Sequence, residues 1–290
     1  SAHEFFDLDE MYEVELPIPS LEKQQEIVNE YDTIVNRIKL NDQLNQKLEE
    51  TSQALYKHWF VDFEFPNVQG RPYKSSGGTM VYNDELDMEI PEGWESCSLY
   101  DTANFINGSS FKNQFFCSDK EGLPIVKIDE LKNGISSKTN FTFQKLDEKF
   151  KIKKGELLYS WSGNPETSLE TFIWLRTNAW LNQHIFKIVK DKDWQDLKFV
   201  YYLLNYLKPT LIRLAKGKQT TGLGHITVAD MKNIRIAYPS RLVMESFVKS
   251  ISPFYNLNTF KQNEILLLQQ KTSLLLSKMT KVEEEEEVAN

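Results

Sequence analysis

Cysteine is scarce in this sequence. The 290 residues include two cysteines, Cys97 and Cys117, and neither belongs to a C-x-x-C pair. A disulfide framework needs more cysteines than this, and a cysteine-bound metal needs closely spaced ligands. We therefore expect a protein of the reducing cytoplasm that has no structural disulfide and no metal site.

Long apolar runs are absent as well. The most apolar stretch, FVYYLLNYL at 199–207, is shorter than the ~20 residues that a membrane helix needs, and Asn205 interrupts it. The first residues do not show the basic-then-apolar pattern of a signal peptide. We expect no membrane contact.

Residues at the spacing of a catalytic site are also missing. The histidines at positions 3, 58, 184 and 225 show no H-x-x-x-H spacing, and DKD at 191–193 lacks the spaced acidic and lysine residues of a nuclease cleft. NPET at 164–167 is similar to the NPP-aromatic tetrapeptide of adenine methyltransferases, but Glu166 and Thr167 replace the second proline and the aromatic residue. No glycine loop that could hold a methyl donor follows a strand. The sequence predicts a protein that is not an enzyme and needs no cofactor.

Charge is present but unevenly distributed. The net charge is -8, yet residues 95–240 hold 21 Lys and Arg against 15 Asp and Glu, while the remainder holds 13 against 27. The potential at a groove depends on charges within about a Debye length, ~8 Å in the cell, so a basic middle can hold phosphates although the whole chain is acidic. Charge alone is equally compatible with an ordinary surface.

Helical periodicity marks the two flanks of the basic middle. In residues 20–63 apolar side chains recur at alternating spacings of three and four, which is typical of a coiled coil, and Asn41, Asn45 and Ser52 interrupt the stripe. Residues 241–282 predict a second long helix, in which Pro253 starts or kinks a segment. An antiparallel pair is the simplest arrangement of two such helices around one domain. The stripe residues we predict to make coiled-coil or partner contacts are Ile27, Tyr31, Ile34, Ile38, Leu48, Leu55, Trp59, Leu257, Ile265, Leu268, Leu275 and Met279.

The segment between the helices predicts one mixed domain. Residues 64–89 are rich in Pro and Gly and predict a linker, and residues 90–240 alternate strand patterns with helical ones, such as GELLYSW and WQDLKFVYYLLNYLKPTLIRLAKG. The acidic end at 283–290 predicts a disordered tail. The expected fold class is therefore α+β, with one mixed α/β domain bracketed by two long helices that form an antiparallel coiled coil.

An internal repeat relates the starts of the two helices. LPIPSLEKQQEIV at 16–28 has the same pattern as IAYPSRLVMESFV at 236–248, so that Pro19 aligns with Pro239 and Ser20 with Ser240 without a gap. The repeated unit is an exit strand, a turn and a long helix. We therefore interpret residues 1–19 as the exit strand and turn of a preceding domain that this sequence lacks.

Seven segments carry a family resemblance, and together they cover most of the chain. They are LPIPSLEKQQEIV (16–28), QALYKHWFVDFEF (53–65), IPEGWE (90–95), GLPIVKIDELKNG (122–134), KKGELLYSWSGN (153–164), AWLNQHIFKI (179–188) and KQTTGLGHITVADMKNIRI (218–236). In this order they resemble the DNA specificity subunits of type I restriction-modification systems.

The resemblance implies a function as well as a fold. In that family two target recognition domains, held apart by two antiparallel spacer helices, each read one half of a split DNA site, while DNA adenine methyltransferase subunits dock on the frame and a motor-nuclease restriction subunit joins them. This sequence has one recognition domain, which would read one half of a bipartite target. A two-fold homodimer would read inverted repeats of that half-site.

The glycine-containing loop at 216–227 is the best candidate for DNA contact. Lysines can neutralise phosphates, glutamine can pair with adenine, and hydroxyls can donate or accept, although a simple turn before the last strand fits the same residues. Two further polar loops, at 108–113 and 160–167, are as compatible with turns as with contacts. Asn182, Gln183 and His184 favour a structural hydrogen-bond network. The candidate DNA-binding residues are Lys216, Lys218, Gln219, Thr220, Thr221, His225, Ser109, Ser110, Lys112, Ser162 and Asn164.

A function of another class remains open at this stage. The long helices could form a protein-interaction module whose middle domain binds protein rather than double-stranded DNA. DNA affinity falls steeply with salt, whereas an apolar protein interface depends on it little, so salt dependence distinguishes the two.

Overall fold

The computed structural model describes residues 18–117, 121–219 and 222–279. The chain divides into two compact units, one made of residues 1–45 and 260–290 and the other of residues 46–259. Two long helices, α2 (Leu21–Phe60) and α7 (Arg241–Met279), each contribute to both units. Most of the expected exit strand at 1–19 and the whole acidic tail at 283–290 lie outside the described residues.

The remaining elements all belong to the unit of residues 46–259. The helices are η1 (Leu99–Thr102), η2 (Asn113–Phe115), α3 (Ile128–Asn133), η3 (Glu148–Phe150), α4 (Pro165–Ser168), α5 (Leu197–Gly217) and α6 (Val228–Asn233). The strands are β1 (Met80–Asn83), β2 (Met88–Pro91), β3 (Glu95–Ser98), β4 (Asn104–Asn107), β5 (Leu123–Val126), β6 (Phe141–Thr142), β7 (Lys151–Ile152), β8 (Leu157–Ser160), β9 (Ser162–Gly163), β10 (Glu170–Ile173), β11 (Ala179–Leu181), β12 (Ile185–Val189), β13 (Gly224–His225) and β14 (Arg235–Tyr238).

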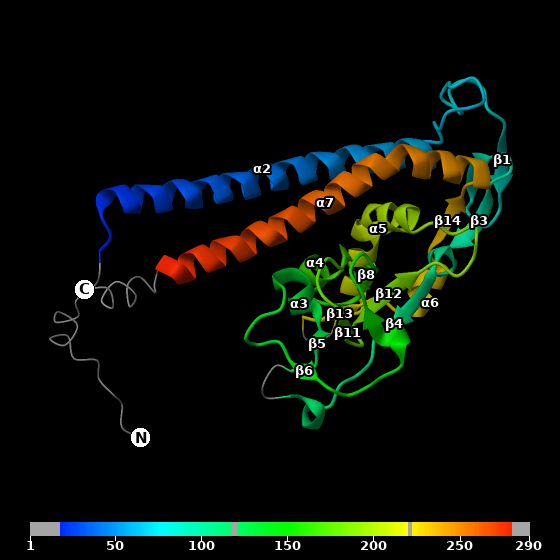
Figure 1. The fold of residues 1–290 in the computed structure, drawn as a ribbon. Coiled ribbons are helices and arrows are strands. Elements are labelled where there is room, and N and C mark those ends of the chain that lie inside the picture. Colours follow the sequence, from blue (N-terminus) through cyan, green and yellow to red (C-terminus); the bar gives the residue numbers. More distant parts are fainter. Residues whose placement is uncertain (1–17, 118–120, 220–221, 280–290) are drawn as a thin grey trace, which may run out of the picture. The chain divides into compact units, whose positions relative to one another are not determined.

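In the unit of residues 1–45 and 260–290, the described parts of α2 and α7 form an antiparallel helix pair (Figure 1, the blue part of α2 and the red part of α7). Arg37 forms an ion pair with Glu264 at 2.7 Å, and Glu30 forms one with Lys271 at 3.1 Å. The lower-numbered residue of α2 thus pairs with the higher-numbered residue of α7, so the two helices run in opposite directions. This direction confirms the expected antiparallel coiled coil.

The seam of this pair is apolar with polar insertions. Ile34 is 4% exposed, Ile265 is 9% exposed, and Ile38 and Leu268 are half-buried at spacings of three and four. Asn41 lies on the same seam and is only 2% exposed. A polar seam residue costs stability but fixes the register of a coiled coil. Asn41 therefore limits the registers in which α2 and α7 can pair, which isoleucines alone would not do.

The other predicted stripe residues differ in burial. In the same unit Ile27 and Leu275 are half-buried, Tyr31 is 36% exposed, and the side chain of Met279 lies outside the described part. In the unit of residues 46–259, Leu48 and Trp59 are buried and Leu55 is half-buried. Leu257 is 40% exposed because the seam passes through its neighbour Asn258, which is 6% exposed. Helix α7 continues through Pro253, so this proline does not start a separate helix.

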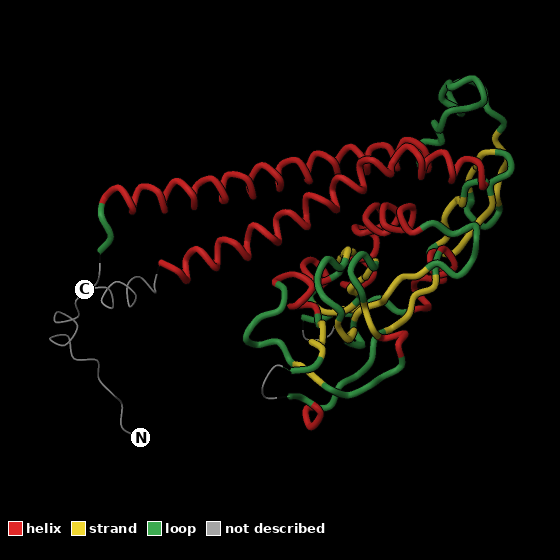
Figure 2. Tube along the Cα trace, viewed as in Figure 1, coloured by secondary structure: helices red, strands yellow, loops and turns green. Residues whose placement is uncertain are grey.

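The unit of residues 46–259 contains all the described strands (Figure 2). One sheet has the order β10-β8-β12-β4 and is wholly antiparallel. The other has the order β6-β5-β11-β7, in which β11 runs parallel to β5 and antiparallel to β7. Three two-stranded pairs, β1 with β2, β13 with β9 and β14 with β3, complete the strand pairing. The α+β expectation is confirmed.

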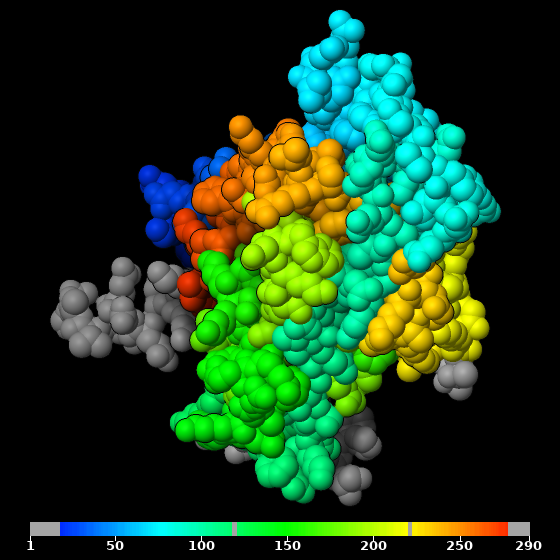
Figure 3. Space-filling model, turned by 90° about the vertical axis from the view of Figure 1, so that its right-hand side faces the viewer, coloured from blue at the N-terminus to red at the C-terminus, as the bar shows by residue number. Residues whose placement is uncertain are grey.

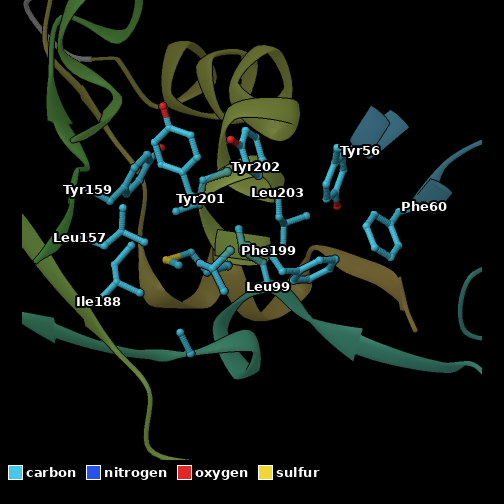
Figure 4. Packing of buried hydrophobic residues seen from close by; sticks show 14 of the residues in the cluster. Tyr56, Phe60, Leu99, Leu157, Tyr159, Ile188, Phe199, Tyr201, Tyr202 and Leu203 are labelled. Carbon is cyan, nitrogen blue, oxygen red and sulfur yellow. The ribbon is translucent and has the colours of Figure 1, made fainter. Parts of the chain in front are cut away.

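Helix α5 forms the middle of the main core (Figure 4). Phe199 and Tyr202 on α5 are almost fully buried, with Leu157 of β8 on one side and Phe60 of α2 on the other. The Phe60 and Phe199 rings meet edge to face with centroids 5.0 Å apart. An aromatic pair of this kind contributes ~0.5–1.5 kcal/mol to stability in addition to the burial of its apolar area. The C-terminal end of α2 is therefore part of the core of this unit.

A carboxylate also joins the helices of this unit. Glu49 of α2 accepts hydrogen bonds from the Tyr201 hydroxyl at 3.1 Å, the Asn205 amide at 3.1 Å and the Asn258 amide at 3.3 Å. Burial, followed by the Glu49 charge, raises the pKa of Tyr201 well above its usual value, so this phenol stays a hydrogen-bond donor. The contact therefore fixes α5 against α2 and α7 within the domain.

The segment expected to be a linker, residues 64–89, is ordered in the structure. It contains β1 and the turn of the β1–β2 hairpin. The Phe65 ring stacks on the rings of Tyr73 and Trp94, with centroid distances of 4.5 Å and 5.2 Å. Arg235 of β14 forms an ion pair with Glu85 beside the hairpin. Figure 3 shows the cyan surface of this segment next to the gold residues around Arg235. Proline and glycine here make turns of a packed segment, because Phe65 is buried and Tyr73 is half-buried against the rest of the domain.

The described residues contain neither a membrane-spanning helix nor a cluster of metal ligands. In the ranges 18–117, 121–219 and 222–279, no helix is both long and apolar enough to cross a membrane. The same residues contain no cluster of three or more His, Cys, Asp or Glu that could hold a metal ion.

The coiled coil should be sensitive to acid through Glu264. Hydrogen bonds from Arg37 and then Lys261 lower the pKa of Glu264 from its usual 4.5 to about 2. The ionised form therefore stabilises the folded state above pH ~4.5, and this contribution disappears as the pH falls toward 2. We expect Glu264→Gln to lower the melting temperature at neutral pH, and the difference from the unmodified chain to vanish near pH 2, as followed by helical circular dichroism.

The control is Glu26→Gln, which removes an exposed carboxylate paired with Lys23 on the same helix. Exposed pairs contribute little, so this variant should melt like the unmodified chain. A difference between Glu264→Gln and the unmodified chain that is the same at every pH would contradict the prediction.

Candidate nucleic-acid interface

Trp161, which follows β8, connects four segments of the domain. Its backbone N–H donates to the His184 carbonyl at 3.3 Å, its carbonyl accepts from the Ile226 N–H at 2.9 Å, and its indole N–H donates to the Asn107 side chain at 3.0 Å. The ring packs 5.7 Å from Phe186 and 5.6 Å, edge to face, from His184. Polar loops that are far apart in the sequence therefore meet around one half-buried side chain.

Two of the predicted loops pair directly with one another. Strands β9 and β13 are antiparallel, with Ser162 opposite His225 and Gly163 opposite Gly224. Gly224 is buried, and a Cβ atom there would lie 2.5 Å from the carbonyl oxygen of Ala215 in α5. A larger residue at this position would push β13 away from α5, so the glycine keeps the 216–227 loop next to the 160–167 loop.

The third predicted loop lies beside the turn at 182–184. Ser109 forms a bridge with Asn182, and the Ser109 N–H donates to the Leu181 carbonyl at 2.9 Å. A Cβ atom on Gly108 would lie 2.1 Å from the Asn182 carbonyl oxygen, because the two backbones touch at this point. Glycine at 108 thus permits the contact between the end of β4 and the end of β11.

The lysines of the candidate loop are paired with carboxylates. Lys216 bonds Glu166 of α4 at 2.5 Å, and Lys218 bonds Asp230 of α6. The hydrogen bond from Lys216 lowers the pKa of Glu166. Burial by itself would raise the pKa of Asp230, but hydrogen bonds from Lys218 and then Thr227 outweigh burial and lower it. Both carboxylates are therefore ionised at neutral pH, and a phosphate would have to compete with them for the lysines.

The structure places the remaining candidates as follows. His225, Ser110 and Lys112 are exposed, and Ser109 and Ser162 are half-buried. Asn164 caps α4, because its side-chain oxygen accepts from the Glu166 N–H at 3.0 Å. The Gln219 amide donates to the Gly222 carbonyl at 2.6 Å, within its own loop. Thr220 and Thr221 lie outside the described residues.

Two residues of the cluster were missed by sequence reasoning. Trp161 and Asn107 did not appear among the candidates, although Trp161 lies within one glycine-containing polar loop and Asn107 directly precedes another. The expected hydrogen-bond network at 182–184 is present in part: the Asn182 side chain accepts from the His184 N–H at 3.3 Å, while Gln183 and His184 are exposed. An aromatic residue beside a glycine-containing loop was the only feature in the sequence that could have indicated them. The loops come together through pairing of strands that are far apart in the sequence, which the sequence pattern does not show.

The close contact at Gly108 can be tested by substitution. We expect Gly108→Ala to destabilise the folded chain by about 1–3 kcal/mol, because the added methyl group would collide with the backbone at Asn182. Urea denaturation measures this change. The control Gly217→Ala adds the same methyl group in open space at the last residue of α5, where alanine should leave stability unchanged or raise it. Equal stabilities of the two variants would contradict the proposed contact.

Comparison with known proteins places the chain in a family. The family model described as "Type I restriction modification DNA specificity domain" matches residues 1–50 and 91–270. The MjaIX specificity subunit of a type I restriction enzyme from Methanocaldococcus jannaschii is 28% identical over 275 residues, which are 92% of this chain and 60% of the relative. The HindI specificity subunit from Haemophilus influenzae is 23% identical, over 93% of this chain and 69% of the relative.

A solved structure shows the same fold. The crystal structure of the S subunit of a type I restriction-modification system from M. genitalium matches with a TM-score of 0.57 at 15% identity, over 94% of this chain and 65% of that one. The chain thus spans about 60% of the length of the M. jannaschii relative. The match of the family model over most of the chain confirms the resemblance seen in the sequence, and the chain belongs to the family of type I restriction modification DNA specificity domains.

Proposed function

We propose that this chain recognises DNA sequence for a type I restriction-modification complex and reads one half of a bipartite target. The observation that carries the proposal is the cluster around Trp161, where polar loops from three parts of the basic segment meet in a member of the DNA specificity family. Base recognition needs several donors and acceptors held at fixed positions, and loops tied to one indole provide them.

Phosphate contacts would come from the lysines around the cluster. Residues 95–240 carry 21 basic against 15 acidic side chains, and Lys112, Lys216 and Lys218 are exposed. Ser109, Ser110, Ser162 and His225 supply donors and acceptors beside them, whereas the Asn164 side chain is engaged in capping α4. We propose Gln219 as a base contact only if its bond to Gly222 opens when DNA binds.

The coiled coil suggests how the chain joins a complex. We propose that α2 and α7 are the spacer helices on which DNA adenine methyltransferase subunits dock, with a restriction subunit joining them, and that residues 90–240 are the target recognition domain. In a homodimer two such domains would read inverted repeats. The work of the complex would take place in the cytoplasm, where host DNA is, and the chemistry would belong to the partner subunits. The alternative of a protein-binding module has no comparable support, because the family match is to DNA specificity domains.

The proposal predicts salt-dependent binding to duplex DNA. Affinity for a duplex mixture, measured by fluorescence anisotropy with the methyltransferase subunit present, should fall by about 10³-fold or more between 50 and 200 mM salt if several phosphates are neutralised. Lys216→Ala should weaken binding to all sequences alike and reduce the salt slope by about 1. The double variant Lys216→Ala, Glu166→Gln should bind more tightly than Lys216→Ala alone, because it removes the carboxylate that the first substitution leaves unpaired.

The control is Lys74→Ala, which removes an exposed lysine from residues 64–89, outside the proposed spacer helices and recognition domain. It should leave affinity and salt slope unchanged. Absence of duplex binding at low salt would contradict the proposed function, and an equal loss in Lys74→Ala and Lys216→Ala would contradict the location of the interface.

A further inference from the structure

Asn107 combines exposure with a fixed position. It ends β4, where it lies opposite Phe186 of β12, and its side chain is exposed. Phe105, two residues earlier on the same face of the strand, is 5% exposed and meets Phe186 edge to face. Asn107 therefore stands where the buried face of the sheet reaches the surface, and the strand beneath it is held by the core.

The indole of Trp161 fixes the orientation of the Asn107 amide. An indole N–H can only donate, so the atom that it contacts at 3.0 Å is the amide oxygen. The amide oxygen keeps a second lone pair, and the NH₂ group on the other side of the carbon has no hydrogen-bond partner among the described residues. The indole itself cannot rotate freely, because its ring packs against Phe186 and its backbone bonds at both the N–H and the carbonyl.

Other polar groups lie around Asn107. The Ser109 loop follows it, and the exposed His184 lies edge to face against Trp161. Packing of the core does not require the half-buried Trp161 ring to hold an exposed amide in one orientation, because Phe105 and Phe186 pack directly against each other. The same geometry suits a side chain that binds a ligand, because a side chain that is already ordered loses little conformational entropy on binding.

We propose that Asn107 reads an adenine through its amide, with Trp161 as the residue that positions it. An asparagine amide can accept from the adenine N6 amino group and donate to N7, which is the pattern that distinguishes adenine in the major groove. The inference rests on the proposed DNA-reading function. It adds a specificity-determining residue and the base that this residue would select.

Selection from a randomised duplex library, followed by sequencing, tests the proposal on the full chain with the methyltransferase subunit present. Asn107→Ala should reduce discrimination at one base pair by about 10- to 100-fold and leave the other positions unchanged. Asn107→Asp keeps the acceptor for the indole but loses the donor, so preference at that position should move from adenine toward cytosine, whose N4 amino group donates. Trp161→Phe keeps the ring but removes the N–H, and it should relax the same position by a smaller factor.

The matched control is Asn104→Ala, at the other end of β4, which should leave the selected sequence unchanged. Melting curves check that each variant folds. The two Asn107 variants and Trp161→Phe change different groups, so the inference can still be tested if one of them does not fold. A library profile that is unchanged in Asn107→Ala, or weakened uniformly at all positions, would overturn the inference while the unmodified chain still selects a sequence. If the unmodified chain selects no sequence at all, the proposed function itself fails.

Discussion

The contacts of Trp161 are the constraint on which the candidate interface depends. One residue bonds to His184, Ile226 and Asn107 and packs on Phe186, so that the ends of β4, β8, β11 and β13 are held together. Loops that carry polar side chains are normally free to move, and their ordering would reduce the affinity for a ligand. Here ordering is already provided by the fold, through the indole and through glycines that let the backbones touch at Gly108 and Gly224.

The helices supply a second constraint, which is a fixed pairing of α2 with its neighbours within each of the two units. In the unit of residues 46–259, Glu49 of α2 ties α5 to α7, and Phe60 enters the aromatic core. In the other unit the seam includes buried Asn41 and the ion pair between Arg37 and Glu264. A seam of apolar residues alone would allow several registers, and these polar groups specify one of them. A frame of fixed register is what a complex needs if it is to hold recognition domains at a set distance.

Sequence alone predicted the parts of this structure that depend on local periodicity. The stripe through Ile34, Ile38 and Ile265 indicated the coiled coil because each helix turn repeats the pattern, and the motif segments indicated the family. We predicted Leu257 on the stripe because it is apolar and its neighbour Asn258 is polar. The structure instead buries Asn258 and leaves Leu257 exposed. The packed hairpin after Phe65 was expected as a linker, since its stacking on Trp94 is not visible in composition. Asn107 and Trp161 could not be paired in advance, because their contact requires β12 to lie between β4 and β8.

If this chain selects a DNA sequence for a methyltransferase, it must determine which adenines are methylated. This can be measured by co-expressing the chain with the adenine methyltransferase subunit of its own system and mapping methylated adenines on host DNA at single-base resolution. We expect methylation at one defined motif that is absent when the chain is omitted, and a split palindrome if two copies assemble. Methylation that is absent, or that follows the same pattern with and without this chain, would contradict it.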